Sequence, residues 1–378
     1  MLRDDGPRSR AELGDAVNLS KSKLADELDR LIELGLVEAG GLAASRGGRR
    51  SSIVHISSQL RFVGIDIGAT SVDVAVTDGE LAILGHVSEQ VDVRDGPQPV
   101  LGCALELLAK LRSEGLAPDI HGAGIGVPGP VSFRDGTPFA PPIMPGWDKY
   151  PVRETLSQEL GCPVLLDNDV NIMALGEHHA GLAKSVADFL FVKIGTGIGC
   201  GIFVDGRVYR GVTGSAGDIG HVSVEEFGPT CACGNAGCLE ALFSGSALAR
   251  DATQAARSTR STYLAQRLAE AGSLTAVDVA DAAAAGDPVA VAMVRDGGRR
   301  VGQVLASLVS FFNPALIVIG GGVSGVGHAL LAEIRGVVYR RSLPLATGNL
   351  PIVTSELGAD AGVTGAAYMI SDHVFHVD

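Results

Sequence analysis

The stretch GHVSVEEFGPTCACGNAGCLE, residues 220–240, gathers three cysteines and a histidine into a short window. The residues are His221, Cys231, Cys233 and Cys238, and the three cysteines are half of the six in the chain. Glycines between the thiols let the backbone turn sharply, so the four side chains can converge on one ion. Three thiolates and an imidazole form a typical closed, structural zinc set. Disulfides and buried free thiols are the alternatives, and we expect zinc.

The composition is that of an ordinary globular protein. The 378 residues are enough for two or three domains, 46% of them are hydrophobic, and the net charge is −13. No apolar run approaches the roughly twenty residues of a membrane-spanning helix, and the start, MLRDDGPRSR, has no apolar signal region. We therefore expect a cytoplasmic protein with reduced thiols and no membrane partner.

The negative charge is unevenly distributed along the chain. Residues 1–60 carry nine basic and nine acidic side chains, so the remainder carries the whole net charge of −13. An acidic surface repels nucleic acid. Any contact with DNA is therefore expected within residues 1–60.

The first sixty residues predict a winged helix-turn-helix domain. Residues 10–17 and 20–34 have the apolar spacing of helices, and residues 36–37 and 51–56 predict two strands of a wing. Since only nine residues precede the first helix, we expect the helix that normally comes before this pattern to be short or missing. The alternative is a solvated helix pair that mediates protein contacts.

The polar and basic residues of this domain predict how it would touch DNA. The second helix starts with a cap and a basic turn, at the end that enters a major groove, and residues 40–50 form a cationic loop. The candidate DNA-binding residues are Ser20, Lys21, Ser22, Lys23, Arg46, Arg49 and Arg50.

Two glycine-rich hairpins predict phosphate-binding loops in the rest of the chain. A strand over residues 61–67 leads through DIGAT into a strand over 72–77, and a strand over 189–194 leads through GTGIG into one over 200–204. A buried strand over 315–319 then opens through three glycines into a helix. Each glycine turn alone is weak evidence, but the three in this order predict a two-lobed actin-like ATPase fold.

The loops supply the candidate nucleotide ligands. The candidate residues for phosphate and magnesium are Asp66, Gly68, Thr70, Gly195, Thr196 and Gly197. The candidate residues on the adenosine side are Gly320, Gly321 and Gly322.

The segment DNDVN, residues 167–171, lies between a strand over 164–166 and a helix over 170–177. Asp169 would stand at the N-terminus of that helix, where the helix dipole favours an ionised carboxylate. Such a group can accept a proton from a sugar hydroxyl that attacks a phosphoryl group. The alternative is a simple capping aspartate.

These motifs together resemble the ROK family of repressors and sugar kinases. The resemblance covers essentially the whole chain and rests on DIGAT (66–70), GIGVPGPV (124–131), PGW (145–147), DNDVN (167–171), GTGIG (195–199), GDIGH (217–221), CACGNAGCLE (231–240) and GGG (320–322). Residues 1–60 make the chain look like the regulator branch, since the plain sugar kinases lack such a domain.

The resemblance implies roles for individual residues. It implies that Asp169 is the catalytic base if the chain is a kinase, and that His221 binds zinc through one ring nitrogen and faces the sugar with the other. The sugar-binding residues that it implies are Asn168, Asp169, Asp218, His221 and Glu240. Structural zinc is the expected cofactor, and Mg-ATP is expected only if the chain is a kinase.

The sequence departs from the kinase pattern mainly at the phosphate side. Gly68-Ala69-Thr70-Ser71 stands where the kinases usually have Gly-Gly-Thr-Lys, so a phosphate-facing lysine is missing from this loop. Asp218 replaces a glutamate, and the apolar residues 141–144 replace a segment that usually carries an asparagine. The sugar side is better preserved than the phosphate side, which favours a sensor over a kinase.

We therefore expect a sugar-responsive DNA-binding regulator, a repressor of carbohydrate metabolism, acting as a homodimer or homotetramer on operator DNA. The expected domains are residues 1–60, a first lobe over 61–175 on which residues 359–378 pack back, and a second lobe over 176–358 with the zinc knuckle. An ATP-dependent sugar kinase that retains a DNA-binding domain is the second hypothesis. A DNA-binding protein that ignores ligands, with its zinc lobe as an oligomer scaffold, is the third.

Overall fold

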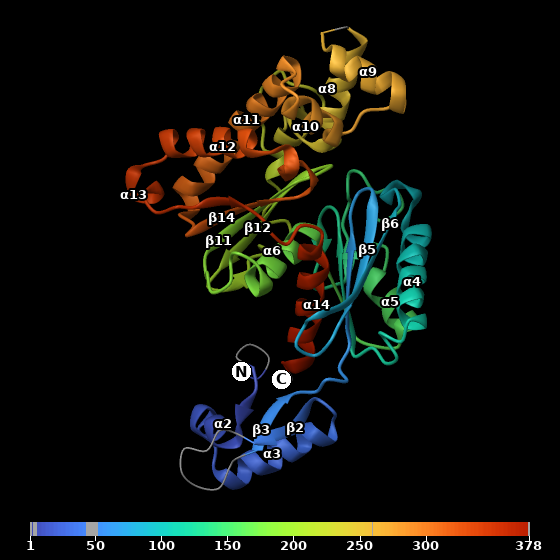
Figure 1. Ribbon diagram of the computed structural model, residues 1–378, viewed down its shortest axis with the longest axis vertical. Coiled ribbons are helices and arrows are strands. Elements are labelled where there is room, and N and C mark those ends of the chain that lie inside the picture. The colour runs from blue at the N-terminus through green and yellow to red at the C-terminus, as the bar shows by residue number, and fades with distance from the viewer. Residues whose placement is uncertain (1, 3–5, 43–51, 259, 377–378) are drawn as a thin grey trace.

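The computed structural model describes the chain except for residues 1, 3–5, 43–51, 259 and 377–378. A small unit of helices and strands lies at one end, and two larger α/β halves lie above it (Figure 1). Among the described residues, no helix has the length and apolarity that crossing a bilayer requires.

The small unit contains the helices α2 (Arg10–Val17) and α3 (Lys21–Glu33), at the positions that the apolar spacing predicts. The Ser20 hydroxyl caps α3 by accepting a hydrogen bond from the backbone N–H of Lys23, 3.3 Å away. Its three strands are paired in the order β1-β3-β2, with bounds Arg8–Ser9, Ser52–Ile56 and Val37–Leu42. The strand β2 therefore extends past Gly40, where a loop was expected, and β1 was not predicted.

The first α/β half is built on a sheet with the strand order β10-β7-β4-β5-β6. Its strands are β4 (Phe62–Ile67), β5 (Ser71–Thr77), β6 (Ile83–Gln90), β7 (Gly122–Val127) and β10 (Val164–Asn168). The strand β4 is antiparallel to β5 and parallel to β7, so the predicted hairpin is present. The other elements of this half are η1 (Val93–Asp95), α4 (Pro97–Ser113), β8 (Val131–Ser132), β9 (Thr137–Pro138) and α5 (Val152–Leu160).

The second half has the same strand order, which in the same direction reads β15-β14-β11-β12-β13. Its strands are β11 (Phe189–Ile194), β12 (Ile198–Val204), β13 (Arg207–Val208), β14 (Leu316–Gly320) and β15 (Ile352–Thr354). The strand β11 is antiparallel to β12 and parallel to β14. Each sheet therefore consists of an antiparallel meander with two parallel strands beside its first strand, which is the duplicated core of an actin-like fold.

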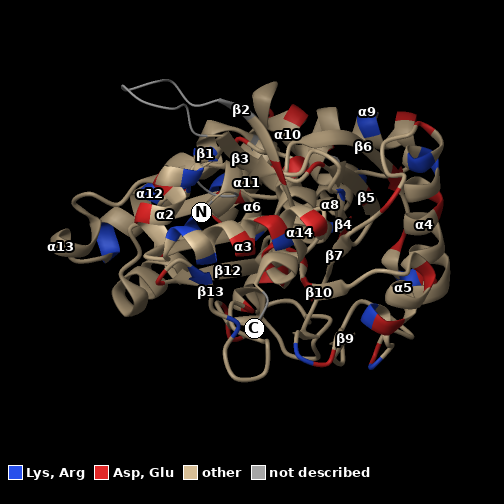
Figure 2. Cartoon of the chain, turned by 90° about the horizontal axis from the view of Figure 1, so that it is seen from below, with Lys and Arg blue, Asp and Glu red and all other residues tan. Residues whose placement is uncertain are grey.

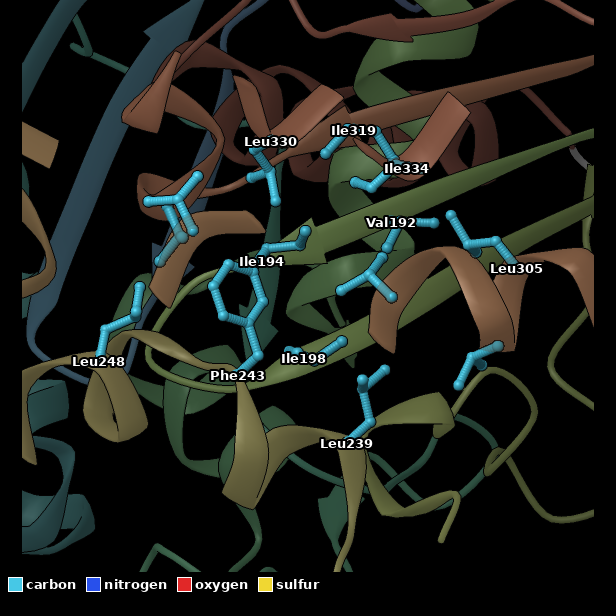
Figure 3. Close-up of a cluster of buried hydrophobic side chains, with 14 of the residues drawn as sticks. Val192, Ile194, Ile198, Leu239, Phe243, Leu248, Leu305, Ile319, Leu330 and Ile334 are labelled. Carbon is cyan, nitrogen blue, oxygen red and sulfur yellow. The ribbon is translucent and has the colours of Figure 1, made fainter. Parts of the chain in front are cut away.

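Helices cover the second sheet and enclose a large core. The helices and short turns of this half are η2 (Ile219–His221), α7 (Leu239–Leu242), α8 (Gly245–Arg257), α9 (Thr262–Ala271), α10 (Ala276–Ala284), α11 (Pro288–Phe312), η3 (Gly322–Val326), α12 (His328–Arg341) and α13 (Pro344–Thr347). Figure 3 shows Val192 and Ile194 of β11 meeting Leu305 of α11, Ile334 of α12 and the Phe243 ring. Burial of these side chains is the main force that holds the half together.

Two helices lie between the sheets, α6 (Asp169–Ala180) and the C-terminal α14 (Asp360–Phe375) (Figure 1). Glycines make the contact close, because a Cβ on Gly365 would lie 1.7 Å from the Ile172 carbonyl oxygen, and one on Gly64 would lie 1.9 Å from the Val363 carbonyl oxygen. The helix α14 therefore packs directly on β4, β7 and α6.

The small unit shares its core with the first half. Leu13 of α2 and Leu28 of α3 are buried in one cluster with Phe62 of β4 and Ile370 of α14. The Phe375 ring at the end of α14 packs edge-on against Phe62, with 6.2 Å between the centroids. One helix thus extends from between the two sheets to the base of the small unit.

Candidate ligand cleft and metal cluster

A cavity of about 870 Å³ lies between the two halves. All fourteen residues that the sequence analysis proposed for sugar, phosphate and adenosine line it. They are Asp66, Gly68, Thr70, Asn168, Asp169, Gly195, Thr196, Gly197, Asp218, His221, Glu240, Gly320, Gly321 and Gly322. The structure brings them together because both hairpin turns, the start of α6 and the end of β14 open toward the same space.

The DNDVN segment is held from both sides. Asn168, and not Asp169, is the N-cap of α6, because its side-chain oxygen accepts the backbone N–H of Val170, 2.9 Å away. The amide nitrogen of Asn168 donates to the Gly129 carbonyl, so one of its two N–H groups remains for a ligand. Asp167 is buried against Arg210, whose Nε lies 2.8 Å from Oδ2. Asp169 is the first residue of the helix.

Asp169 has a partner that the sequence analysis missed. Lys193 Nζ, on β11 of the other half, donates to Asp169 Oδ2 at 2.5 Å, and the two side chains are 15% and 8% exposed. Burial alone would lower the pKa of Lys193, but the charges of Asp169 and Asp66 outweigh burial and raise this pKa above its ordinary value. The first hairpin loop does lack a lysine, yet the opposite sheet supplies one to the same cavity.

A signal for Lys193 was present in the sequence. It is a single charged residue in the otherwise apolar strand FLFVKI, and it stands two residues before the glycine turn, as Asp66 does in FVGIDI. A charge at such a place is costly unless it faces a partner or a cavity. Only the packing of the two halves reveals that the partner is Asp169.

Asp66 is the most enclosed carboxylate of the cavity. Its Oδ1 has no hydrogen-bond partner among the described residues, and its Oδ2 would lie 1.9 Å from a Cβ built on Gly362 of α14. Burial raises the pKa of Asp66 to about 7; Lys193 opposes this rise, and Asp169 and Asp73 add to it. An unpaired, buried carboxylate oxygen at a cavity wall is a suitable ligand for a cation or a cation-bound water.

The glycine turns give the cavity its close backbone walls. Gly195 N–H donates to the Gly197 carbonyl at 2.8 Å, which closes the second hairpin turn, and Gly245 N–H donates to the Gly195 carbonyl at 2.6 Å. Gly321 adopts a φ of 86° next to the Ile194 carbonyl, a conformation that favours glycine. The three-glycine segment leads first into the short η3 and only then into α12.

The wall of the cavity beside the second hairpin turn carries Glu240, His221 and Asp218. Glu240 accepts a hydrogen bond from the backbone N–H of Ile198 at 3.0 Å, and it is fixed because its neighbour Leu239 is completely buried and Phe243 is nearly so. His221 turns its Nε2 toward Asp218, with 3.8 Å to Oδ1. A hydroxyl-rich ligand would find acceptors on this wall.

The other ring nitrogen of His221 faces the cysteines. Its Nδ1 lies 3.5 Å from Cys231 Sγ, and Cys233 Sγ lies 3.7 Å from Cys238 Sγ. The four ligand atoms all lie within 4.8 Å of one another, so the cluster could hold a metal ion. The hydrogen bond from the Asn235 backbone lowers the pKa of Cys233 to about 7, toward the thiolate form that metals bind.

The backbone of residues 220–240 explains how the cysteines converge. Gly237 has a φ of 69°, and a Cβ there would lie 1.5 Å from the Glu225 carbonyl oxygen. Cys231 N–H donates to the Asn235 carbonyl at 2.7 Å and closes the knuckle. Arg300 of α11 anchors the segment through an ion pair with Glu225, with 2.8 Å between Nη2 and Oε1.

The predicted DNA-binding residues of α3 lie at its exposed N-terminal end. Ser20, Lys21, Ser22 and Lys23 are all exposed, whereas the charged residues in the rest of the helix are acidic except for Arg30. Figure 2 views the molecule from the side of this unit and shows basic and acidic residues interspersed on it. Arg46, Arg49 and Arg50 lie outside the described residues.

Residues 62–373 match the family model described as ROK family. The chain belongs to the ROK family. This match covers both halves of the cleft and begins after the small unit.

Relatives of two kinds match this ROK chain. A glucokinase of Halalkalibacterium halodurans is 35% identical, over 82% of this chain and 94% of its own length. A xylose repressor of Caldicellulosiruptor bescii is 30% identical, over 96% of this chain and 92% of its own. The crystal structure of a ROK family transcriptional regulator, a homologue of the E. coli MLC protein, superposes with a TM-score of 0.82 at 26% identity, over 98% of this chain and 93% of that one.

The regulator relatives and the glucokinase relatives differ in how much of this chain they match. The matches to the repressor and to the regulator structure are too long to fit after residue 61, so they include part of the small unit. The glucokinase match is no longer than the part of the chain that follows residue 61. The small unit is thus shared with regulators.

Proposed function

We propose that this ROK protein is a sugar-responsive, DNA-binding transcriptional regulator, a repressor of carbohydrate metabolism genes. The observation that carries the proposal is the shared coverage of the small unit together with the cleft in regulator relatives. We treat residues 1–60 as the DNA-binding domain. Residues 61–175 with α14 form the first lobe of the sensor, and residues 176–358 form the second.

DNA binding is assigned to the small unit as a winged helix-turn-helix. The helix α3 would enter the major groove with its exposed first turn, where Lys21 and Lys23 lie and where backbone N–H groups also favour phosphate. Its acidic C-terminal half would point away from the DNA. Because such domains commonly read two half-sites, we propose that the protein acts as a homodimer or homotetramer.

Sugar binding is assigned to the wall formed by Asn168, Asp218, His221 and Glu240. Zinc held by His221, Cys231, Cys233 and Cys238 would fix the orientation of the His221 ring, so that its second nitrogen faces the ligand. The donor set, with a tight cluster of three thiols and one imidazole, suits this metal.

The helix α14 supports a coupling route between the cleft and the DNA-binding domain. Its first turn packs on Asp66 through Gly362, and its last turns lie in the cluster that contains Leu13 and Leu28. A sugar that moves the two halves relative to each other would shift this helix and, with it, the base of the DNA-binding domain.

An ATP-dependent sugar kinase is the second candidate function. It is favoured by Asp169 in a cavity with two glycine hairpins, and by the glucokinase relatives. The residues present can accommodate Mg-ATP in part, since Asp66 offers an unpaired oxygen and the hairpin backbones offer close walls. Mg-ATP would supply the phosphoryl group and its charge compensation, and Asp169 would accept the proton of the sugar hydroxyl.

The proposal is tested with the full-length protein and DNA selected from a random pool. D-xylose, D-glucose and other common sugars are then titrated while fluorescence anisotropy follows the DNA. We expect at least one sugar to change the DNA affinity by about tenfold or more, a typical allosteric coupling. Sugar-dependent ATP turnover with no effect of any sugar on DNA binding would contradict the regulator and favour the kinase.

A further inference from the structure

The two sheets place opposite charges at equivalent positions. Asp66 is the fifth residue of β4 and Lys193 is the fifth residue of β11, and each is followed by an isoleucine and the glycine of a hairpin turn. Both strands hold the same place in their sheets, with the hairpin partner on one side and a parallel strand on the other. The duplicated fold therefore brings a carboxyl group, from Asp66, and an amino group, from Lys193, into one cavity from its two halves.

Lys193 is the one lysine or arginine among the described residues that line this cavity, and five carboxylates line it too. The carboxylates are Asp66, Asp73, Asp169, Asp218 and Glu240. Its ammonium contacts Asp169 directly, and both side chains are almost completely buried. In such surroundings the Coulomb interaction between two charges is stronger than at the surface, so a second cation close to the ammonium is repelled.

We propose that Lys193 is a built-in counter-ion that takes the place of a divalent metal between the cleft carboxylates and so suppresses phosphoryl transfer. This inference rests on the proposed function of a sensor, because it states how the cleft binds sugar without using Mg-ATP. A magnesium ion at Asp66 would share the cavity wall with a fixed ammonium group. The polyphosphate of ATP would meet the remaining carboxylates without the metal that normally compensates its charge.

The same contact restrains the base that a kinase would need. Oδ2 of Asp169, which would accept the proton of a sugar hydroxyl, already accepts a hydrogen bond from the Lys193 ammonium, and Oδ1 accepts one from the backbone N–H of Val170. The pair also joins the halves, since Lys193 belongs to the second sheet and Asp169 follows β10 of the first. A neutral sugar can share Asp169 by hydrogen bonding without displacing the ammonium, so sugar binding is compatible with the pair.

The test compares Lys193→Met with Lys184→Met, a matched control at an exposed lysine of the same half. The probe is Mn²⁺, followed by electron paramagnetic resonance in the zinc-loaded, full-length protein. We expect Lys193→Met to bind Mn²⁺ at least about tenfold more tightly than the wild type, and Lys184→Met to be unchanged. The double variant Lys193→Met/Asp66→Asn should lose the gained affinity.

A second readout is ATP turnover with D-glucose and D-xylose, where Lys193→Met should exceed the wild type. Unchanged Mn²⁺ affinity in a folded Lys193→Met protein would overturn the inference. So would a wild type that phosphorylates sugar and loses this activity in the variant, because Lys193 would then be a phosphate-binding catalytic residue. If the methionine variant does not fold, Lys193→Gln, which can still donate a hydrogen bond to Asp169, is measured in its place.

The outcome is separable from that of the proposed function. Sugar-dependent DNA binding by the wild type tests the regulator, and Mn²⁺ affinity tests the role of Lys193. A regulator that responds to sugar while Lys193→Met gains no metal affinity would contradict only the inference.

Discussion

The two α/β halves have the same strand order but carry different chemistry at their hairpin turns. The first half presents Asp66 before the turn DIGAT, and the second presents Lys193 before the turn GTGIG. The first half has no counterpart of the cysteine cluster, among the described residues, whereas the second has His221 beside three thiols. The duplicated backbone thus supplies two similar hairpin turns, and single side chains decide that an acidic residue precedes one turn and a basic residue precedes the other.

Among the variants that test this difference between the halves, we expect Cys233→Ser to have the largest effect. Loss of one thiolate should release the metal, loosen residues 220–240 and lower sugar affinity by about 10- to 100-fold, since His221 and Glu240 lie on that segment. Elemental analysis measures the metal content of the variant, and a sugar titration measures its affinity. Cys103→Ser, a half-buried cysteine of the first half, is the matched control and should change neither. Freshly purified wild type without zinc would contradict the prediction.

The ion pair across the halves is tested with Asp169→Asn. A sensor should show little ATP turnover before or after the change, a modest change in sugar affinity, and a stability loss of up to about 3–5 kcal/mol, because Lys193 keeps its buried charge without its direct partner. The proximity of Asp66 should reduce that loss. If the wild type turns over ATP and Asp169→Asn lowers the rate by about 10²–10⁴-fold, Asp169 is a general base and the kinase is favoured.

The small unit, to which we assign DNA binding, should be separable from the difference between the halves. Lys21→Ala with Lys23→Ala should weaken DNA binding and reduce the salt slope by about two counterions, because both exposed cations are removed from the first turn of α3. Sugar affinity and metal content should stay at their wild-type values. An unchanged salt slope would show that this turn is not on the DNA.

The smallest expected effect belongs to His86, which joins the first half to α14. His86 lies 3.3 Å from Asp73 Oδ1 and 2.8 Å from Asp360 Oδ1, and the hydrogen bond to Asp73, followed by that to Asp360, raises the pKa of His86 above 6.5 against the effect of burial. The stabilisation is present below pH 6.5 and is lost as the pH rises through the higher folded-state pKa.

We therefore expect His86→Gln to lower stability by about 1 kcal/mol or less at pH 6 and by a smaller amount at pH 8.5. Thermal unfolding at the two pH values measures it. A larger loss at pH 8.5 than at pH 6 would mean that His86 acts through packing and not through its charge.

Local patterns were sufficient to predict much of this protein. The apolar spacing located α2 and α3, and β11 begins and ends at the predicted residues Phe189 and Ile194. The motif residues of both hairpins and of DNDVN line one cavity, because the glycine turns and strand ends that carry them open toward the same space. The alternative interpretation of Asp169 as a capping residue was wrong, because Asn168 is the N-cap of α6. Asparagine and aspartate both cap helices well, so the sequence did not distinguish these two neighbours.

The sequence by itself determined the family, the duplicated hairpins and the candidate metal ligands, because each depends on residues that are close together in the chain. The tertiary structure alone decided that Lys193 meets Asp169, that Arg210 meets Asp167, and that α14 connects Asp66 to the base of the small unit. These contacts join residues from different strands and halves, and the spacing of residues along the chain does not predict them. A charge in a strand becomes interpretable only when the side chain that neutralises it is known.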